Sequence, residues 1–179
     1  MEIKKISFKN KVFKEIKIFK KEIFRDNRGC FTRIFCEKEF QKNNIKFQIK
    51  QINFSSNKSK GIIRGMHYQD YFSKEAKIVI CLKGIIHDVV VDIRKNSQTY
   101  LKSFSIILSA NNNKILYIPP GFAHGFQTLE NDTEVLYLHN KNFNKKIYRT
   151  INPLDIKLNI RWPIKKKIIS KKDLNKKYL

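Results

Sequence analysis

Hydrophobic and polar residues alternate along most of the chain, in short runs that end at turn-forming residues. From residue 3 to residue 54, Ile, Phe and Val alternate with Lys and Glu, the period-two pattern of strands with one buried face. Residues 26–29 (DNRG) have the composition of a turn, followed by a strand over residues 30–36. The one short helix expected here covers residues 37–44, before another alternating run at residues 48–55.

The middle of the chain continues with short strands at regular spacing. Residues 77–82 and 85–93 flank Lys83-Gly84, which predicts a β-hairpin. Further strands are expected at residues 100–108, 114–118, 125–129 and 133–139. Many short strands separated by turn residues are typical of a β-sandwich or a β-barrel. The sequence therefore predicts an all-β fold.

Length predicts a single domain over residues 1–179. A chain of 179 residues can bury one substantial core but is short for two ordinary domains. No internal repeat or linker divides it. We expect N-terminal strands over residues 1–55, a core barrel over 56–140, and a C-terminal segment over 141–179 that packs back on the cleft.

Composition favours a cytoplasmic protein. No run of about 18 apolar residues is available to cross a membrane, and no signal peptide is visible at the N-terminus. The three cysteines, Cys30, Cys36 and Cys81, form an odd set without C-x-x-C spacing. Neither a disulfide framework nor a zinc site is indicated, which fits a reducing compartment.

The net charge of +23 raises the possibility of a nucleic-acid or other polyanion partner. The lysines are scattered among Ile and Asn rather than focused in one patch, however. Dense clusters occur only near the C-terminus, at residues 165–167, 171–172 and 176–177. We interpret these clusters as a solvated tail, and nucleic acid is not the expected partner.

One stretch, residues 61–69 (GIIRGMHYQ), contains candidate chemistry on a predicted buried strand. Arg64 offers a planar fork of donors suited to a phosphate, and His67 is the side-chain type that most readily carries a proton near neutral pH. The alternative for His67 is a histidine that is hydrogen-bonded within the core.

Five stretches, in order, resemble the nucleotide-sugar epimerases of the dTDP-4-dehydrorhamnose 3,5-epimerase type. The resemblance covers almost the whole chain, and it implies a double-stranded β-helix, the cupin-like jelly roll. The stretches are residues 26–31 (DNRGCF), 60–69 (KGIIRGMHYQ), 77–79 with 88–94 (KIV, DVVVDIR), 119–126 with 136–137 (PPGFAHGF, LY), and 160–163 with 170–173 (IRWP, SKKD).

The resemblance implies epimerisation beside the 4-keto group of a nucleotide-linked deoxysugar, in the synthesis of surface polysaccharide. A ketone acidifies the adjacent C–H, so the reaction needs a base, an acid and a cation near the keto oxygen. His67 matches the family's base, Asp173 its carboxylate partner, Lys77 the cation and Tyr137 the proton donor. By the sequence alone, Asp173 would be a surface carboxylate, Lys77 an exposed strand-edge lysine and Tyr137 a core tyrosine.

The resemblance also implies a set of substrate contacts. Arg28 and Arg64 match ligands of phosphate or sugar, and Phe143 matches an aromatic ring that stacks on the base. The remaining matches are Gln51, Asn53, His124 and Lys172. Two positions depart from the family pattern, in which glutamates are common: they are Arg33 and Tyr148 in this chain. Arg33 is still counted among the expected substrate contacts. The nucleotide is therefore left open among dTDP, GDP, CDP and UDP, and the sugar between a deoxyhexose and a heptose. Inversion at C3 alone or at C3 and C5 is also left open.

No metal and no cofactor are expected. The four histidines, His67, His87, His124 and His139, contain no His-x-His pair, which disfavours a cupin metal site. Two rival functions are a 3,4-ketoisomerase of the same fold, acting on similar sugars, and a noncatalytic sandwich that binds a polyanion. The resemblance further implies a homodimer, and strands with exposed edges are compatible with strand exchange between subunits.

Overall fold

The computed structural model describes residues 3–6 and 13–174, and strands dominate them. This confirms the all-β prediction. The strands are β1 (Ile3–Ile6), β2 (Lys17–Lys21), β3 (Ile23–Asp26), β4 (Gly29–Thr32), β5 (Gln51–Asn57), β6 (Ile62–Gln69), β7 (Lys77–Lys83), β8 (Ile85–Asp92), β9 (Ser103–Ser109), β10 (Lys114–Ile118), β11 (Phe122–Thr128), β12 (Thr133–His139), β13 (Tyr148–Thr150) and β14 (Ile168–Ile169). The helices are α1 (Glu37–Gln41), η1 (Tyr71–Ser73), η2 (Ile156–Leu158) and α2 (Lys171–Leu174).

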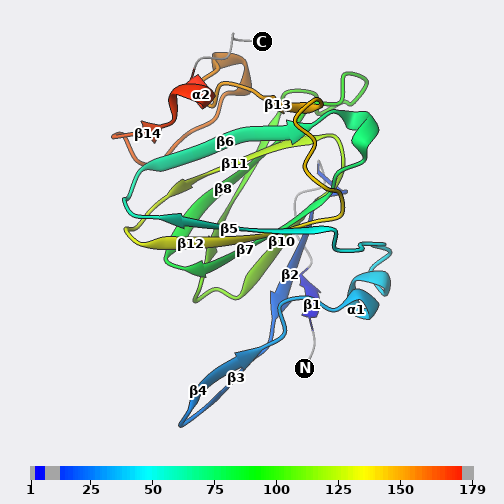
Figure 1. Ribbon diagram of the computed structural model, residues 1–179, viewed down its shortest axis with the longest axis vertical. Helices are drawn as coiled ribbons and strands as arrows, with labels where there is room; N and C mark the ends of the chain where they lie inside the picture. Colours follow the sequence, from blue (N-terminus) through cyan, green and yellow to red (C-terminus); the bar gives the residue numbers. More distant parts are fainter. Residues whose placement is uncertain (1–2, 7–12, 175–179) are drawn as a thin grey trace.

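Two sheets pack face to face as the expected cupin-like jelly roll (Figure 1). The first sheet has the order β1-β2-β10-β7-β12-β5, and the second has the order β13-β6-β11-β8-β9 with β14 beside β6. Between them lies an apolar core that includes Val79, Val90, Leu116, Phe126 and Val135. The sandwich is therefore held by the inward-facing residues of both layers.

The central strand β7 has both faces buried, which explains its continuous apolar sequence. Val79 and Cys81 point into the core between the sheets. Ile78 and Ile80 point outward, where the segment around α1 covers them with Phe40 and other aromatic rings. A strand covered on both faces cannot show the alternation of a half-buried strand.

The predicted hairpin of residues 77–82 and 85–93 is wrong. Both strands form, but β7 pairs with β10 and β12 in the first sheet, whereas β8 pairs with β9 and β11 in the second. The chain crosses between the layers at Gly84, whose φ is +76° and whose Cβ, if present, would lie 2.7 Å from Thr133 Oγ1. A short glycine link thus also serves a crossover between two packed sheets.

Several strand bounds differ from the predictions. The strand expected over residues 30–36 ends at Thr32 in β4, and the strand expected from residue 100 begins at Ser103 in β9. The turn at residues 26–29 is confirmed by the β3–β4 hairpin, which projects from the body of the molecule (Figure 1). Residues 7–12 of the expected N-terminal strands and the lysines at residues 176–177 lie outside the described residues.

Candidate functional site

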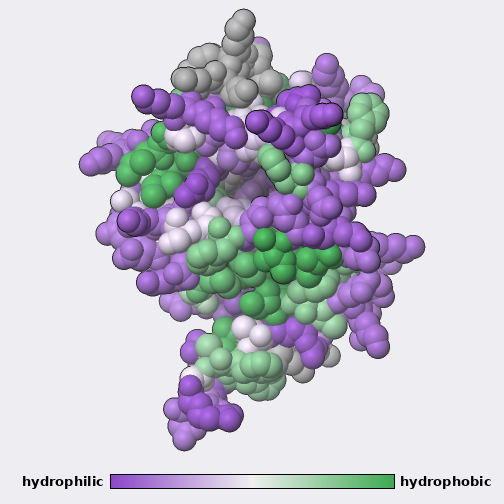
Figure 2. Space-filling model, in the orientation of Figure 1, coloured by the Kyte–Doolittle hydropathy of each residue, from purple (hydrophilic) through white to green (hydrophobic). Residues whose placement is uncertain are grey.

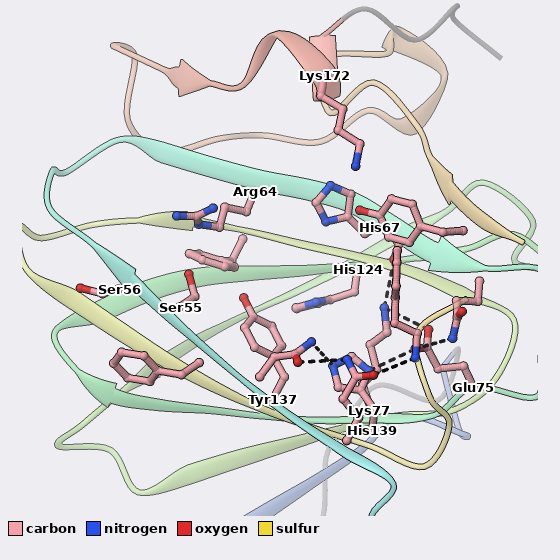
Figure 3. Close-up of a pocket in the computed structure, with 17 residues that line it drawn as sticks. Ser55, Ser56, Arg64, His67, Glu75, Lys77, His124, Tyr137, His139 and Lys172 are labelled. Carbon is pink, nitrogen blue, oxygen red and sulfur yellow. Dashed lines mark hydrogen bonds and ion pairs between the residues drawn. The ribbon is translucent and has the colours of Figure 1, made fainter. Parts of the chain in front are cut away.

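A cleft of about 600 Å³ opens between the two sheets (Figure 3). Strands of both layers and the C-terminal segment contribute to its walls. The lining residues are Gln51, Asn53, Phe54, Ser55, Ser56, Arg64, His67, Gln69, Glu75, Lys77, His124, Phe126, Tyr137, His139, Phe143, Tyr148 and Lys172. The cleft therefore collects most of the chemistry-bearing residues expected from the sequence.

An irregularity in β6 brings Arg64 and His67 to the same face. In a regular strand, residues three positions apart point to opposite faces. Here His67 pairs with His124 and Arg64 pairs with Phe126, so three steps along β6 match two steps along β11. Gly65 takes up the extra residue at φ +119°, in close contact with Gly125. Such a bulge re-aims side chains, and both Arg64 and His67 line the cleft.

His67 and Asp173 form a directly hydrogen-bonded pair at the cleft wall. The distance from His67 Nε2 to Asp173 Oδ1 is 2.7 Å, and the two side chains are 29% and 7% exposed. Burial alone would raise the pKa of Asp173, but its interactions with His67, together with hydrogen bonds from Ser170 and the backbone of Gly65, outweigh burial and lower that pKa. The carboxylate is thus ionised beside the ring, and it can stabilise an imidazolium.

Asp173 reaches the cleft because the C-terminal segment is tied to the second sheet. β14 pairs in parallel with β6, and the side-chain amide of Gln127 makes two hydrogen bonds, of 3.0 and 2.9 Å, with the backbone of Ile164. Gly61 allows the close approach, since a Cβ there would lie 2.3 Å from the carbonyl oxygen of Lys166. The C-terminal segment therefore brings Asp173 to the cleft wall, while the lysines at residues 165–167 and 171–172 are exposed to solvent, as predicted for these clusters.

Tyr137 and Lys77 line the cleft from the first sheet. The ring of Tyr137 lies 6.0 Å from that of His124, and burial raises the pKa of its hydroxyl. Lys77 is buried, and its Nζ lies 3.3 Å from both the carbonyl oxygen of His67 and Glu75 Oε2. The alternative of an exposed strand-edge lysine is wrong, because β7 is a central strand.

A second histidine–carboxylate pair involves His124, which also lines the cleft. His124 Nε2 is 2.8 Å from Asp88 Oδ2, and both residues are buried. The other oxygen of Asp88 has no hydrogen-bond partner among the described residues. Within residues 3–6 and 13–174, no group of three or more His, Cys, Asp and Glu side chains is arranged to hold a metal ion.

Most of the expected substrate contacts also lie at the cleft. Gln51 and Asn53 come from β5, and Phe143 comes from the loop after β12. Arg64 is oriented by a hydrogen bond of 2.7 Å from its Nε to Asn57 Oδ1. Lys172 Nζ lies 4.9 Å from the centre of the Tyr148 ring, which also contacts Phe143 in a T-shaped arrangement.

The structure does not bring Arg28 or Arg33 to the cleft of their own chain. Arg28 lies at the tip of the β3–β4 hairpin, where its side chain is 85% exposed and pairs with Asp26. Arg33 pairs with Glu39, near α1. Neither lines the cleft.

Sequence reasoning missed Glu75 and His139, which lie together at the cleft floor. Glu75 Oε1 is 3.1 Å from His139 Nδ1 and 3.0 Å from Gln69 Nε2. Alternation offered a signal, because His139 follows Tyr137 by two positions on the same strand and must share its face. For Glu75, the available signal was its position two residues before Lys77, which was itself an expected site residue.

Comparisons with known proteins point to one family. The family model described as dTDP-4-dehydrorhamnose 3,5-epimerase matches residues 10–179. The dTDP-4-dehydrorhamnose 3,5-epimerase of Shigella flexneri is 40% identical over 162 residues, which cover 90% of this chain and 89% of that protein.

Solved structures agree with the sequence comparisons. The dTDP-4-dehydrorhamnose 3,5-epimerase of Bacillus anthracis, with TDP and PPi bound, matches with a TM-score of 0.92 and 33% identity over 99% of both chains. The dTDP-6-deoxy-D-glucose-3,5-epimerase of Legionella pneumophila, in complex with dTDP-4-keto-L-rhamnose, matches with a TM-score of 0.88 and 34% identity, over 96% of this chain and 90% of that one. Among residues 3–6 and 13–174, no helix is long and apolar enough to span a membrane.

Proposed function

The chain belongs to the dTDP-4-dehydrorhamnose 3,5-epimerase family, and on this basis we propose that it inverts C3 and C5 of a dTDP-linked 4-keto-6-deoxy sugar. The protein is an isomerase of deoxysugar biosynthesis, and we assign its product to surface polysaccharide. The observation that carries the proposal is that His67 and Tyr137 lie on opposite sheets of one cleft, with Lys77 extending from the first sheet toward the second (Figure 3). His67 is paired with Asp173 of α2.

The reaction begins with removal of a proton from the carbon beside the ketone. His67 accepts this proton on Nδ1, because its Nε2 faces Asp173, and Asp173 stabilises the resulting imidazolium. The electron pair of the C–H bond moves into the enolate, whose oxygen is stabilised by the ammonium of Lys77.

Inversion requires that a proton return from the other face. Tyr137 donates its phenolic proton to the carbon, and the tyrosinate is then reprotonated from solvent. A pKa raised by burial keeps the tyrosine protonated until the enolate forms. After the His67 imidazolium releases its proton to solvent, the same pair of groups acts at C5 as it did at C3, and the ketone stays at C4 throughout.

The nucleotide end of the substrate is bound by the outer part of the cleft. Arg64 and Lys172 supply positive charge for the diphosphate, and Phe143, which is 53% exposed, offers a face on which the base stacks. Gln51 and Asn53 supply hydrogen bonds to the nucleoside. The relatives that carry dTDP or dTDP-sugar names favour dTDP over GDP, CDP or UDP.

The proposal includes a homodimer. The β3–β4 hairpin pairs with no other strand among those described, although an isolated hairpin is only marginally stable in water. Its Phe24 and Phe31 are 53% and 70% exposed. On the edge strand β5, Ile52 and Phe54 are 57% and 58% exposed. Figure 2 shows apolar surface on this side of the molecule. Exposed edges and apolar patches of this kind favour pairing with a second subunit.

A dimer would also give roles to the two arginines that lie away from the cleft. Arg28, at the hairpin tip, and Arg33, after β4, contact the nucleotide bound by the partner subunit. Light scattering that finds a monomer at working concentration would exclude this part of the proposal. The reaction is placed in the cytoplasm, because the three cysteines are free thiols, as in a reducing compartment.

Product analysis tests the proposed reaction. The enzyme is incubated with the 4-keto-6-deoxyglucose derivatives of dTDP, GDP, CDP and UDP, and the products are followed by NMR. We expect turnover of the dTDP sugar, with inverted C3 and C5 and the carbonyl still at C4. A carbonyl at C3 would identify a ketoisomerase, and no change in any of the four sugars would favour the polyanion-binding alternative.

A further inference from the structure

A continuous row of hydrogen bonds runs along the cleft floor from the nucleotide end to Lys77. The backbone N–H of Phe143 donates to Gln51 Oε1 at 2.7 Å, and Gln51 Nε2 donates to Asn53 Oδ1 at 3.0 Å. Asn53 Nδ2 is 3.3 Å from His139 Nε2. Figure 3 shows the row continuing through His139 to Glu75, whose other oxygen pairs with Lys77.

The direction of every bond in this row follows from its first donor. A backbone N–H can only donate, so it orients the oxygen of Gln51 toward Phe143 and the amide nitrogen toward Asn53. Asn53 must then accept with its oxygen and present its own amide nitrogen to His139. His139 Nε2 is left as an acceptor, which places the ring proton on Nδ1, toward Glu75.

We infer that His139, as the neutral Nδ1–H tautomer, is a positioning residue that couples the nucleotide contacts Gln51 and Asn53 to Lys77 through Glu75. The inference rests on the proposed function, because the proposed function places the nucleotide at one end of the row, near Gln51, and the keto oxygen at the other, near Lys77. It adds His139 and Glu75 to the residues on which the reaction depends, without contact between either and the reacting carbon.

The surroundings of His139 support a fixed tautomer. Its side chain is 10% exposed, and the charged groups that face it are Glu75 and Lys77, with the Tyr137 ring 6.3 Å away on its own strand. From β5 its ring meets the uncharged Asn53, and its cross-strand partner is the uncharged Gln51; the backbone N–H of Lys50 donates to its carbonyl oxygen. Burial would raise the pKa of Glu75, but the hydrogen bond with His139 and the charge of Lys77 outweigh burial and lower it, so Glu75 is an anionic acceptor.

Acid should break the row at a defined point. A protonated His139 carries N–H groups on both ring nitrogens and presents a donor to the amide nitrogen of Asn53. The amides of Asn53 and Gln51 then have to turn, and the N–H of Phe143 loses its acceptor. Affinity for the nucleotide is therefore expected to fall as His139 is protonated.

Nitrogen-15 NMR of the histidine rings tests the tautomer in the free enzyme, without any substrate. His139 signals are assigned as those missing from His139→Ala. At about pH 8, in the mildly alkaline range, we expect a protonated Nδ1 and an unprotonated Nε2. An Nε2–H tautomer, or an imidazolium at that pH, would overturn the inference.

Calorimetric titration with dTDP tests the coupling. At about pH 8, His139→Ala should bind dTDP about tenfold more weakly than the unchanged protein, as expected for the loss of a buried hydrogen-bonded link. The affinity of this variant for dTDP should also depend less on pH, because the contribution of His139 to that dependence is absent. His87→Ala, which removes a histidine packed on Trp162 and away from the cleft, is the matched control and should keep both affinity and pH dependence.

The outcomes separate the inference from the proposed function. If dTDP does not bind the unchanged protein at any pH, the assigned nucleotide is wrong, while the NMR result still decides the tautomer. If dTDP binds and His139→Ala matches His87→Ala in affinity and pH dependence, the coupling is wrong and the proposed function stands.

Discussion

Three histidine–carboxylate pairs have their histidine at the cleft, and two of them, those of His67 and His124, lie side by side but differ in burial and in the origin of the carboxylate. His67 and His124 are direct cross-strand partners on β6 and β11. The side chain of His67 is 29% exposed, and its partner Asp173 comes from the C-terminal segment, 106 residues further along the chain. The side chain of His124 is 5% exposed, and its partner Asp88 comes from the adjacent strand β8.

The difference teaches that the same pair of residue types can serve two purposes. A ring that is partly open to the cleft can exchange a proton with a bound sugar. A ring enclosed within the sheet, with its carboxylate fully buried, is suited to hold a fixed arrangement next to Tyr137. We therefore assign proton transfer to His67 and a substrate-facing wall to His124.

The largest effect is expected from His67→Ala. Loss of a positioned base costs roughly 10²–10⁴-fold in rate, so kcat/KM for the dTDP sugar should fall by about 10³-fold. The melting temperature should change little, because the ring is partly exposed. His87→Ala serves as the control, and equal activity of the two variants would remove His67 from the mechanism.

A second large effect is expected from Asp173→Asn. The amide can still contact His67 but does not stabilise an imidazolium, so kcat should fall by about 10²-fold with a smaller change in KM. Steady-state kinetics measure the effects on kcat and on KM separately. A variant with unchanged kcat would show that His67 acts without its carboxylate.

Asp88→Ala is expected to act mainly on stability. Breaking a buried pair by removal of one partner costs about 3–5 kcal/mol, which corresponds to a melting temperature lower by roughly 6–20 °C for a chain of this size. Calorimetry of Asp88→Ala and Asp173→Ala compares the two pairs directly. The assignment fails if Asp173→Ala is the less stable variant.

The smallest effect is a pH dependence of stability at the His67–Asp173 pair. The pKa of Asp173 is lower in the folded protein than its ordinary value, so the pair stabilises the fold above about pH 4. That contribution is lost as the pH falls through the folded pKa. The difference in melting temperature between the unchanged protein and Asp173→Asn should therefore shrink on acidification, and a difference that grows would contradict the stated sign.

The sequence predicted local structure better than it predicted partners. Strands β10 and β12 have the predicted bounds, 114–118 and 133–139, because alternation and turn residues are local signals. The mistaken hairpin of β7 and β8 arose because the same local pattern fits two strands in different sheets.

The candidate site shows the same limit. The common orientation of Arg64 and His67 depends on a bulge opposite β11, which no local pattern encodes. From its surroundings in the sequence, Asp173 is one carboxylate in a lysine-rich tail, and only the resemblance to a family singled it out. The row of hydrogen bonds through His139 joins strands that are far apart in the chain, so only the folded structure displays it.

Hydrogen exchange during turnover tests the central claim most directly. The dTDP-linked 4-keto-6-deoxy sugar is incubated in D₂O with the unchanged protein, His67→Ala and Tyr137→Phe, and deuterium at each carbon is followed by NMR and mass spectrometry. We predict uptake at C3 and C5 with inversion for the unchanged protein, and none for His67→Ala. Tyr137→Phe should take up deuterium with retained configuration, because the proton on His67 exchanges with D₂O and the base then delivers a deuteron to the face from which the proton was removed. Uptake by His67→Ala at the rate of the unchanged protein would contradict the account.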